Sequence, residues 1–224
     1  MTELIFMLTH HDVTIPNAIE VFDEVKETGI KFIGCKDVGL PIDKLRELFG
    51  KMKKADITTF IEIVSDDEEK HFAGVKTAIK VDADYLIGGM PQFTKKTLEY
   101  LKNKKAKLKF FPYIGKIVGH PCVLEGKVDE IINNGIEFEA IGIDGINLLL
   151  YRYVGDVDTL LNEAVKNLRV PLIIAGSIDN FEKIDQLKSK NVWAFTIGGA
   201  ILEKRFAPGK SVSEQVSVVL QHLR

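Results

Sequence analysis

The sequence has little cysteine, no long apolar run and no excess of basic residues. Its two cysteines, Cys35 and Cys122, lack CxxC or Cys/His spacing, which excludes a disulfide framework and argues against a structural zinc site. No apolar run approaches the roughly 20 residues of a membrane helix, and the segment Met1–Leu8 lacks the features of a signal peptide. Lys plus Arg number 30 and Asp plus Glu 32. We therefore expect a cytoplasmic protein with neither a nucleic-acid nor a membrane partner.

Short apolar runs alternate along the chain with longer segments patterned as amphipathic helices. The runs predict strands at Leu4–Leu8, Lys31–Cys35, Thr58–Val64, Tyr85–Ile87, Leu108–Phe111, Ala140–Ile143, Leu172–Ala175 and Ala194–Ile197. The longer segments predict helices at Asn17–Thr28, Ile42–Lys54, Asp67–Val81, Thr94–Asn103, Lys127–Asn133, Val157–Leu168, Phe181–Ser189 and Ser213–Leu223. Glycines placed just past a helix, Gly29 and Gly135, mark two of the expected helix ends.

This alternation predicts an α/β protein with a parallel sheet. Eight units in 224 residues leave 28 residues each, close to the minimum for a (β/α)₈ TIM barrel, which we expect to form a single compact domain over residues 1–224. An open doubly wound sheet that binds a dinucleotide would carry GxGxxG after its first strand. The chain instead continues Thr9-His10-His11-Asp12, with no glycine.

Glycines follow both of the last two predicted strands. The seventh ends Ala175-Gly176-Ser177 and the eighth ends Ile197-Gly198-Gly199-Ala200-Ile201. Loops at these places in TIM barrels often bind phosphate, because glycine lets backbone N–H groups approach the anion. Tight turns alone would also explain such glycines.

These residues resemble the ribulose-phosphate-binding barrel superfamily, in particular its N-acetylmannosamine-6-phosphate 2-epimerase branch. The resemblance covers roughly Pro171 to Leu202. It implies phosphate binding at Gly176, Ser177, Gly198 and Gly199, and it carries no catalytic residue over to this chain.

Three ionisable residues are expected at the carboxyl ends of strands, where TIM barrels place their catalytic groups. Lys36 shares a strand face with Phe32 and Gly34, Glu62 shares one with Phe60, and Asp144 follows Gly142 at the same spacing. We predict that Lys36, Glu62 and Asp144 converge as catalytic groups, with the pKa of Lys36 lowered by burial. An ion pair of Lys36 and Glu62 that closes the barrel mouth, with Asp144 in a turn, remains the alternative.

Four further residues are candidates for substrate binding: His10 after the first strand, Lys116 and His120 in a glycine-punctuated loop after the fifth, and Arg152 after the sixth. The apolar stretch Leu148–Arg152 would be costly in a solvated loop, which suggests a lid or a contact in a homo-oligomer.

The expected function is that of an isomerase or epimerase. It would act on a phosphorylated sugar or sugar acid by acid–base proton transfer through an enediolate or enolate. Two alternatives remain open: an aldolase or lyase that uses the same enolate, and a regulatory barrel that senses a phosphorylated ligand without turning it over. We expect no cofactor, although Asp37, Glu62 and Asp144 could hold Mg²⁺.

Overall fold

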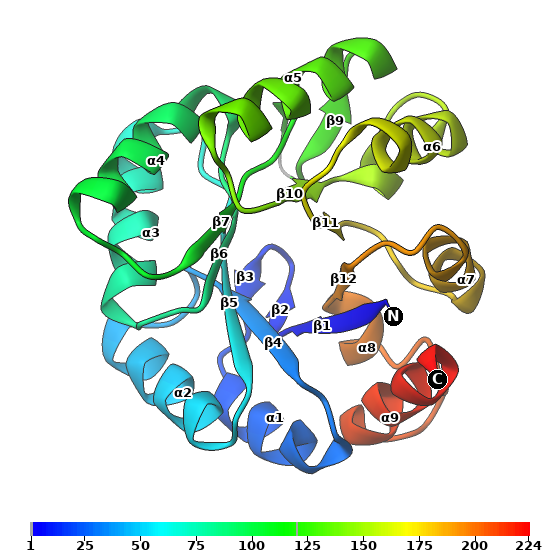
Figure 1. The fold of residues 1–224 in the computed structure, drawn as a ribbon. Helices are drawn as coiled ribbons and strands as arrows, with labels where there is room; N and C mark the ends of the chain where they lie inside the picture. Colours follow the sequence, from blue (N-terminus) through cyan, green and yellow to red (C-terminus); the bar gives the residue numbers. More distant parts are fainter. Residues whose placement is uncertain (1, 120) are drawn as a thin grey trace.

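Eight parallel strands form the wall of a nearly closed barrel (Figure 1). The computed structural model describes residues 2–119 and 121–224. The strands, in sheet order, are β10 (Ile146–Leu148), β11 (Leu172–Ile174), β12 (Ala194–Ile197), β1 (Glu3–Met7), β4 (Phe32–Lys36), β5 (Thr58–Ile63), β6 (Tyr85–Gly88) and β7 (Lys109–Phe111). Tyr113 after β7 pairs with Asn147 of β10, whose N–H donates to the carbonyl of Pro112 at 2.9 Å and bridges the remaining gap. The predicted TIM barrel is confirmed.

Helices surround the strands (Figure 1), since each connection returns the chain to the same end of the barrel. They are α1 (Ala18–Val25), η1 (Lys26–Thr28), α2 (Ile42–Lys54), α3 (Glu68–Lys80), η2 (Pro91–Phe93), α4 (Thr94–Asn103), α5 (Val128–Ile141), η3 (Leu150–Arg152), α6 (Val157–Asn167), α7 (Phe181–Ser189), α8 (Gly199–Leu202) and α9 (Val212–Leu223). Several begin at a capping side chain, such as Asp67, which accepts from the N–H of Lys70. Among the described residues, none of these helices is long and apolar enough to cross a membrane.

Two short hairpins follow barrel strands at their carboxyl ends. Hairpin β2 (Thr9–His10) with β3 (Val13–Thr14) follows β1, and hairpin β8 (Lys116–Val118) with β9 (Val123–Glu125) follows β7. The hydroxyl of Thr14 accepts from the N–H of Lys36 at 2.9 Å and donates to its carbonyl at 2.7 Å. The first hairpin is thereby fixed to the end of β4.

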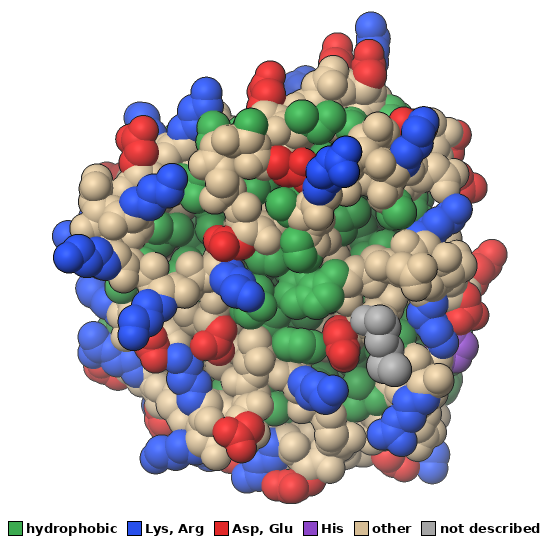
Figure 2. Space-filling model, viewed as in Figure 1, with side chains coloured by type: hydrophobic (Ala, Val, Ile, Leu, Met, Phe, Trp, Pro, Cys, Tyr) green, Lys and Arg blue, Asp and Glu red, His purple; other side chains and the backbone are tan. Residues whose placement is uncertain are grey.

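The strands bury side chains on both faces, as expected in a barrel covered by helices. Inward residues form the barrel interior: Ile5, Met7, Phe60, Ile87, Phe111, Ile173 and Ala194. At its amino-terminal end the ring of Trp193 lies 5.4 Å from that of Phe111, 5.6 Å from Tyr85 and 6.2 Å from Phe32, measured between centroids. The face in Figure 2 has hydrophobic side chains at its centre and charged ones around them.

The sixth unit differs from its prediction. The expected strand over Ala140–Ile143 is wrong, because α5 continues to Ile141 and the strand is β10. The helix does not end at Gly135: a Cβ there would lie 2.7 Å from a methyl carbon of Leu168, so close helix packing requires glycine inside the helix. Gly142, with φ of 91°, is the residue that ends α5.

Candidate active site

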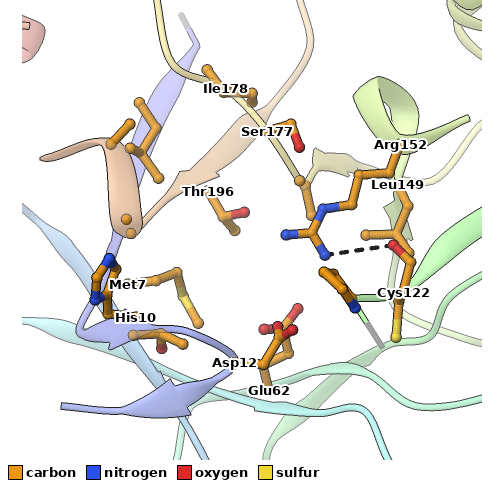
Figure 3. Close-up of a pocket in the computed structure, with 18 of the residues that line it drawn as sticks. Met7, His10, Asp12, Glu62, Cys122, Leu149, Arg152, Ser177, Ile178 and Thr196 are labelled. Atoms are coloured by element: carbon orange, nitrogen blue, oxygen red, sulfur yellow. Dashed lines mark hydrogen bonds between the residues drawn. The ribbon is translucent and has the colours of Figure 1, made fainter. Parts of the chain in front are cut away.

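A pocket of about 350 Å³ opens at the carboxyl ends of the barrel strands. Figure 3 shows the carboxylates of Asp12 and Glu62 pointing into it from one side and the guanidinium of Arg152 from the other. Of the predicted site residues, Lys36, Glu62, His10, Arg152 and all four glycine-turn residues line this pocket. Most of the predicted site residues therefore meet in one pocket, although they come from segments far apart in the chain.

One side of the pocket carries ionisable groups: the buried Lys36, Glu62 and Tyr113 and the partly exposed Asp12, which we call the charged wall. The Lys36 ammonium lies 2.7 Å from the Asp12 carboxylate and 3.7 Å from that of Glu62. The side chains of Lys36 and Glu62 are only 6% and 11% exposed. The Tyr113 hydroxyl donates to the other oxygen of Glu62 at 2.6 Å. Each charge in this wall is therefore paired, as a buried charge requires.

The pairing decides the protonation of the charged wall. Burial by itself opposes the charged form of Lys36, but Glu62 and Asp12 outweigh it, so the pKa of Lys36 is raised. This direction is opposite to the lowered pKa expected from the sequence, because Glu62 and Asp12 together outweigh the effect of burial. Burial and the neighbouring Glu62 raise the pKa of Tyr113 well above its ordinary value. At neutral pH the wall contains an ammonium group and a neutral phenol.

The facing side of the pocket is built from backbone, and we call Gly176, Ser177, Gly198 and Gly199 the glycine wall. Gly176 and Ser177 have left-handed φ angles of 84° and 55°. A Cβ at Gly198 would lie 2.6 Å from the carbonyl oxygen of Thr9, so no larger residue fits there. The N–H groups of Gly176, Ser177, Gly199 and Ala200 donate to no protein group in the described residues. Four such donors at one end of the pocket suit an anion.

Arg152 supplies a cation beside the glycine wall. Its side chain packs on Gly176, where a Cβ would come within 2.9 Å, and its guanidinium donates to the carbonyl of Cys122 at 3.5 Å (Figure 3). On the outer rim, His10 lies 2.9 Å from Glu203, which also pairs with Arg205 at 2.6 Å. The hydrogen bonds from His10 and Arg205 lower the pKa of Glu203.

Asp144 is not part of the pocket, and its predicted convergence with Lys36 and Glu62 is wrong. It precedes β10 instead of following it. Its carboxylate accepts from the N–H of Phe110 at 2.9 Å, and its own N–H donates to the carbonyl of Phe110 at 3.1 Å. The misplaced strand is the cause, because a segment shifted to the start of β10 lies at the amino-terminal end of the barrel.

Two other predictions for the fifth and sixth loops also change. Lys116 lies on β8 and does not line the pocket, and its ammonium pairs with Glu125 at 2.8 Å on the surface. His120 lies outside the described residues. In the stretch Leu148–Arg152, the three leucines are buried in the fold, so they give no reason to expect a lid or a subunit contact.

Two members of the charged wall, Tyr113 and Asp12, were not predicted from the sequence. Tyr113 lies two residues beyond the inward Phe111, so strand periodicity extended past the end of β7 could have found it. Asp12 reaches Lys36 only because the turn of the first hairpin bends back over the barrel, with φ of 48° and 61° at His11 and Asp12. Nothing in the local pattern indicates that bend.

The residues suggested for Mg²⁺ are separated. Asp37 packs beside Gly74, where a Cβ would lie 2.5 Å from its carboxylate, and burial raises its pKa to about 6. Asp144 lies at the amino-terminal end of the barrel, opposite the pocket. Within the described residues, no group of three or more His, Cys, Asp or Glu side chains is arranged to hold a metal ion.

No family model and no curated protein matches the chain. Solved structures match it over nearly its whole length. N-acetylmannosamine-6-phosphate 2-epimerase from Clostridium perfringens is 18% identical, with a TM-score of 0.64 over 91% of each chain. Phosphoribosylanthranilate isomerase from Thermotoga maritima is 11% identical, with a TM-score of 0.65 over 100% of this chain and 98% of its own. The YdjI aldolase from Escherichia coli K12 is 14% identical, with a TM-score of 0.61 over 99% and 88%. These likenesses establish the barrel fold.

Proposed function

We propose that this protein is an isomerase or epimerase that moves a proton on a small phosphorylated sugar or sugar acid. One observation carries the proposal: a buried Lys36–Glu62 pair lies across one pocket from a wall of backbone N–H groups that have no partner among the described residues. The first suits proton transfer next to a carbonyl, and the second suits a phosphate group.

Glu62 is the base in this proposal. The proton it removes lies next to a carbonyl, whose oxygen gains negative charge as the enolate forms. The Lys36 ammonium, held protonated by Asp12 and Glu62, stabilises that charge. The phosphate, anchored by the glycine wall and by Arg152, fixes the position of the reacting carbon relative to Glu62.

The names of similar barrels agree with this substrate class. An epimerase of N-acetylmannosamine 6-phosphate and a phosphoribosylanthranilate isomerase both share the fold. An aldolase also shares it. An aldolase that forms a Schiff base needs a neutral amine, and the raised pKa of Lys36 opposes this. The raised pKa therefore disfavours a Schiff-base aldolase that uses Lys36.

The proposal is tested by hydrogen exchange. A panel of aldose, ketose and sugar-acid phosphates is incubated with the protein in D₂O, and the loss of each C–H signal is followed by ¹H NMR. We expect at least one compound to exchange, and Glu62→Gln to slow that exchange by about 100-fold or more.

The rival functions give different results. A compound that stabilises the protein against heat without exchange or turnover would identify a ligand sensor. A borohydride-stable adduct on Lys36 would identify a Schiff-base aldolase. Either result would replace the proposed function.

A further inference from the structure

A second group able to donate a proton reaches the same pocket from another element. Cys122 directly precedes β9, and its side chain lines the pocket while remaining 4% exposed. The neighbouring β9 is anchored by the fully buried Leu124, and Arg152 donates to the carbonyl of Cys122. The thiol is therefore held in place at the mouth of the barrel.

The surroundings of Cys122 suit a residue that donates a proton to a substrate in the pocket. Its thiol interacts electrostatically with Lys36, Glu62, Asp12 and Arg152. Burial raises its pKa, and Lys36 offsets only part of this effect. The thiol thus keeps its proton at neutral pH, and the cations of Lys36 and Arg152, which line the same pocket, favour the thiolate that would remain after the proton leaves.

We propose that Cys122 is a second acid–base residue of this site, which donates its thiol proton to the substrate carbon on the face opposite Glu62. This inference rests on the proposed function and makes it specific: the reaction is an inversion at carbon, that is, an epimerisation. Figure 3 shows the Glu62 carboxylate and the Cys122 sulfur at separate places, both below the guanidinium of Arg152 in that view.

The proton balance of the step is complete without a further reagent. The Glu62 carboxylate removes the proton on carbon, and the C–H electron pair enters the enolate. The enolate then returns its electron pair to carbon and takes the proton of Cys122 on its other face. The enzyme is left with a carboxylic acid and a thiolate, and exchange with water restores both groups for the next turnover.

The second cysteine provides the control. Cys35 alternates with the inward Gly34 and Lys36 along β4, so it faces the helices and belongs to the outer core. It is fully buried, and burial raises its pKa to about 12. It should neither meet a pocket reagent nor affect turnover.

The first test is labelling with bromoacetol phosphate, a haloketone that carries a phosphate group, followed by peptide mass spectrometry. We expect Cys122 to be alkylated at a rate that saturates with reagent and falls at least tenfold with inorganic phosphate, whereas Cys35 stays unlabelled. Phosphate-protected labelling of Glu62 without Cys122 would overturn this inference alone. Failure to label either residue in a phosphate-protected manner would overturn the proposed function as well.

The second test uses any compound that the parent exchanges in D₂O. Cys122→Ser should keep the Glu62-dependent loss of the C–H signal while the interconversion of epimers falls about 100-fold or more. Cys35→Ala should interconvert the epimers at the parent rate. If Cys122→Ser interconverts them as fast as the parent, Cys122 is not the second acid.

Discussion

The two walls of the pocket are built by different physical means. The charged wall consists of side chains that are paired with one another, and those of Lys36, Glu62 and Tyr113 are buried, so removing one of them leaves a partner less compensated. The glycine wall consists of backbone, with no space for a Cβ at Gly198 and room for one at Gly199. Changes in the first wall should therefore affect folding and chemistry together, while suitable changes in the second should affect binding alone.

The largest effect is expected from Lys36→Met in the charged wall. It removes the ammonium group that lies 2.7 Å from the Asp12 carboxylate and 3.7 Å from that of Glu62 in a mostly buried site. We expect the free energy of unfolding, measured by urea denaturation, to fall by about 3–5 kcal/mol. Glu62→Gln should cost clearly less, because Lys36 keeps its 2.7 Å contact with Asp12. Equal stability of parent and Lys36→Met would show that the pairing does not support the fold.

The contrasting experiment places a charge in the glycine wall. Among the described residues, a Cβ at Gly199 would meet only His10 at 3.5 Å and Glu203 at 3.7 Å, so Gly199→Asp should fold. Its carboxylate would oppose a bound phosphate, and we expect thermal-shift titrations with inorganic phosphate to show at least tenfold weaker binding than in the parent. Unchanged phosphate binding in this variant would place the anion elsewhere.

Two alanine variants serve as controls for this contrast. Gly199→Ala keeps the backbone N–H and has room for its methyl group, so it should bind phosphate like the parent. Gly198→Ala should instead lower the melting temperature, because its methyl group would meet the carbonyl of Thr9.

Variants of the two walls should also differ in how their stability, relative to the parent, changes at alkaline pH. Because the folded pKa of Lys36 is raised, its contribution to stability is complete below the unfolded value of about 10.4 and is lost as pH rises through the folded pKa. The difference in unfolding free energy between parent and Lys36→Met should therefore be constant from pH 7 to about 10 and then narrow. The difference in unfolding free energy between the parent and Gly199→Asp should not change from pH 7 to above pH 10. A difference for Lys36→Met that widens above pH 10 would contradict the raised pKa.

The sequence predicted the parts of this molecule in which local pattern and tertiary structure agree. Alternation of side chains along β4 and β5 was enough to direct Lys36 and Glu62 inward, and the glycine turns were recognised because their task is local. Asp12 was not predicted because it lies in a turn, where the alternation of side chains along a strand does not apply. The sixth strand was predicted wrongly because Gly135 is required by close packing against Leu168, which lies 33 positions further along the chain. A local sequence pattern contains no information on such a contact.

The smallest effect is expected from Asp144, which distinguishes a carboxylate of the charged wall from one at the other end of the barrel. Its hydrogen bond to the N–H of Phe110 helps to join β7 to the start of β10, where the barrel closes. Asp144→Ala should lower the free energy of unfolding by about 1–2 kcal/mol, and Asp144→Asn, which retains an acceptor oxygen, should cost less. Neither should change phosphate binding or hydrogen exchange at carbon, since Asp144 does not line the pocket. An exchange defect in Asp144→Asn at unchanged stability would mean that the charge at this end acts on the chemistry, and the assignment of function to the pocket end alone would fail.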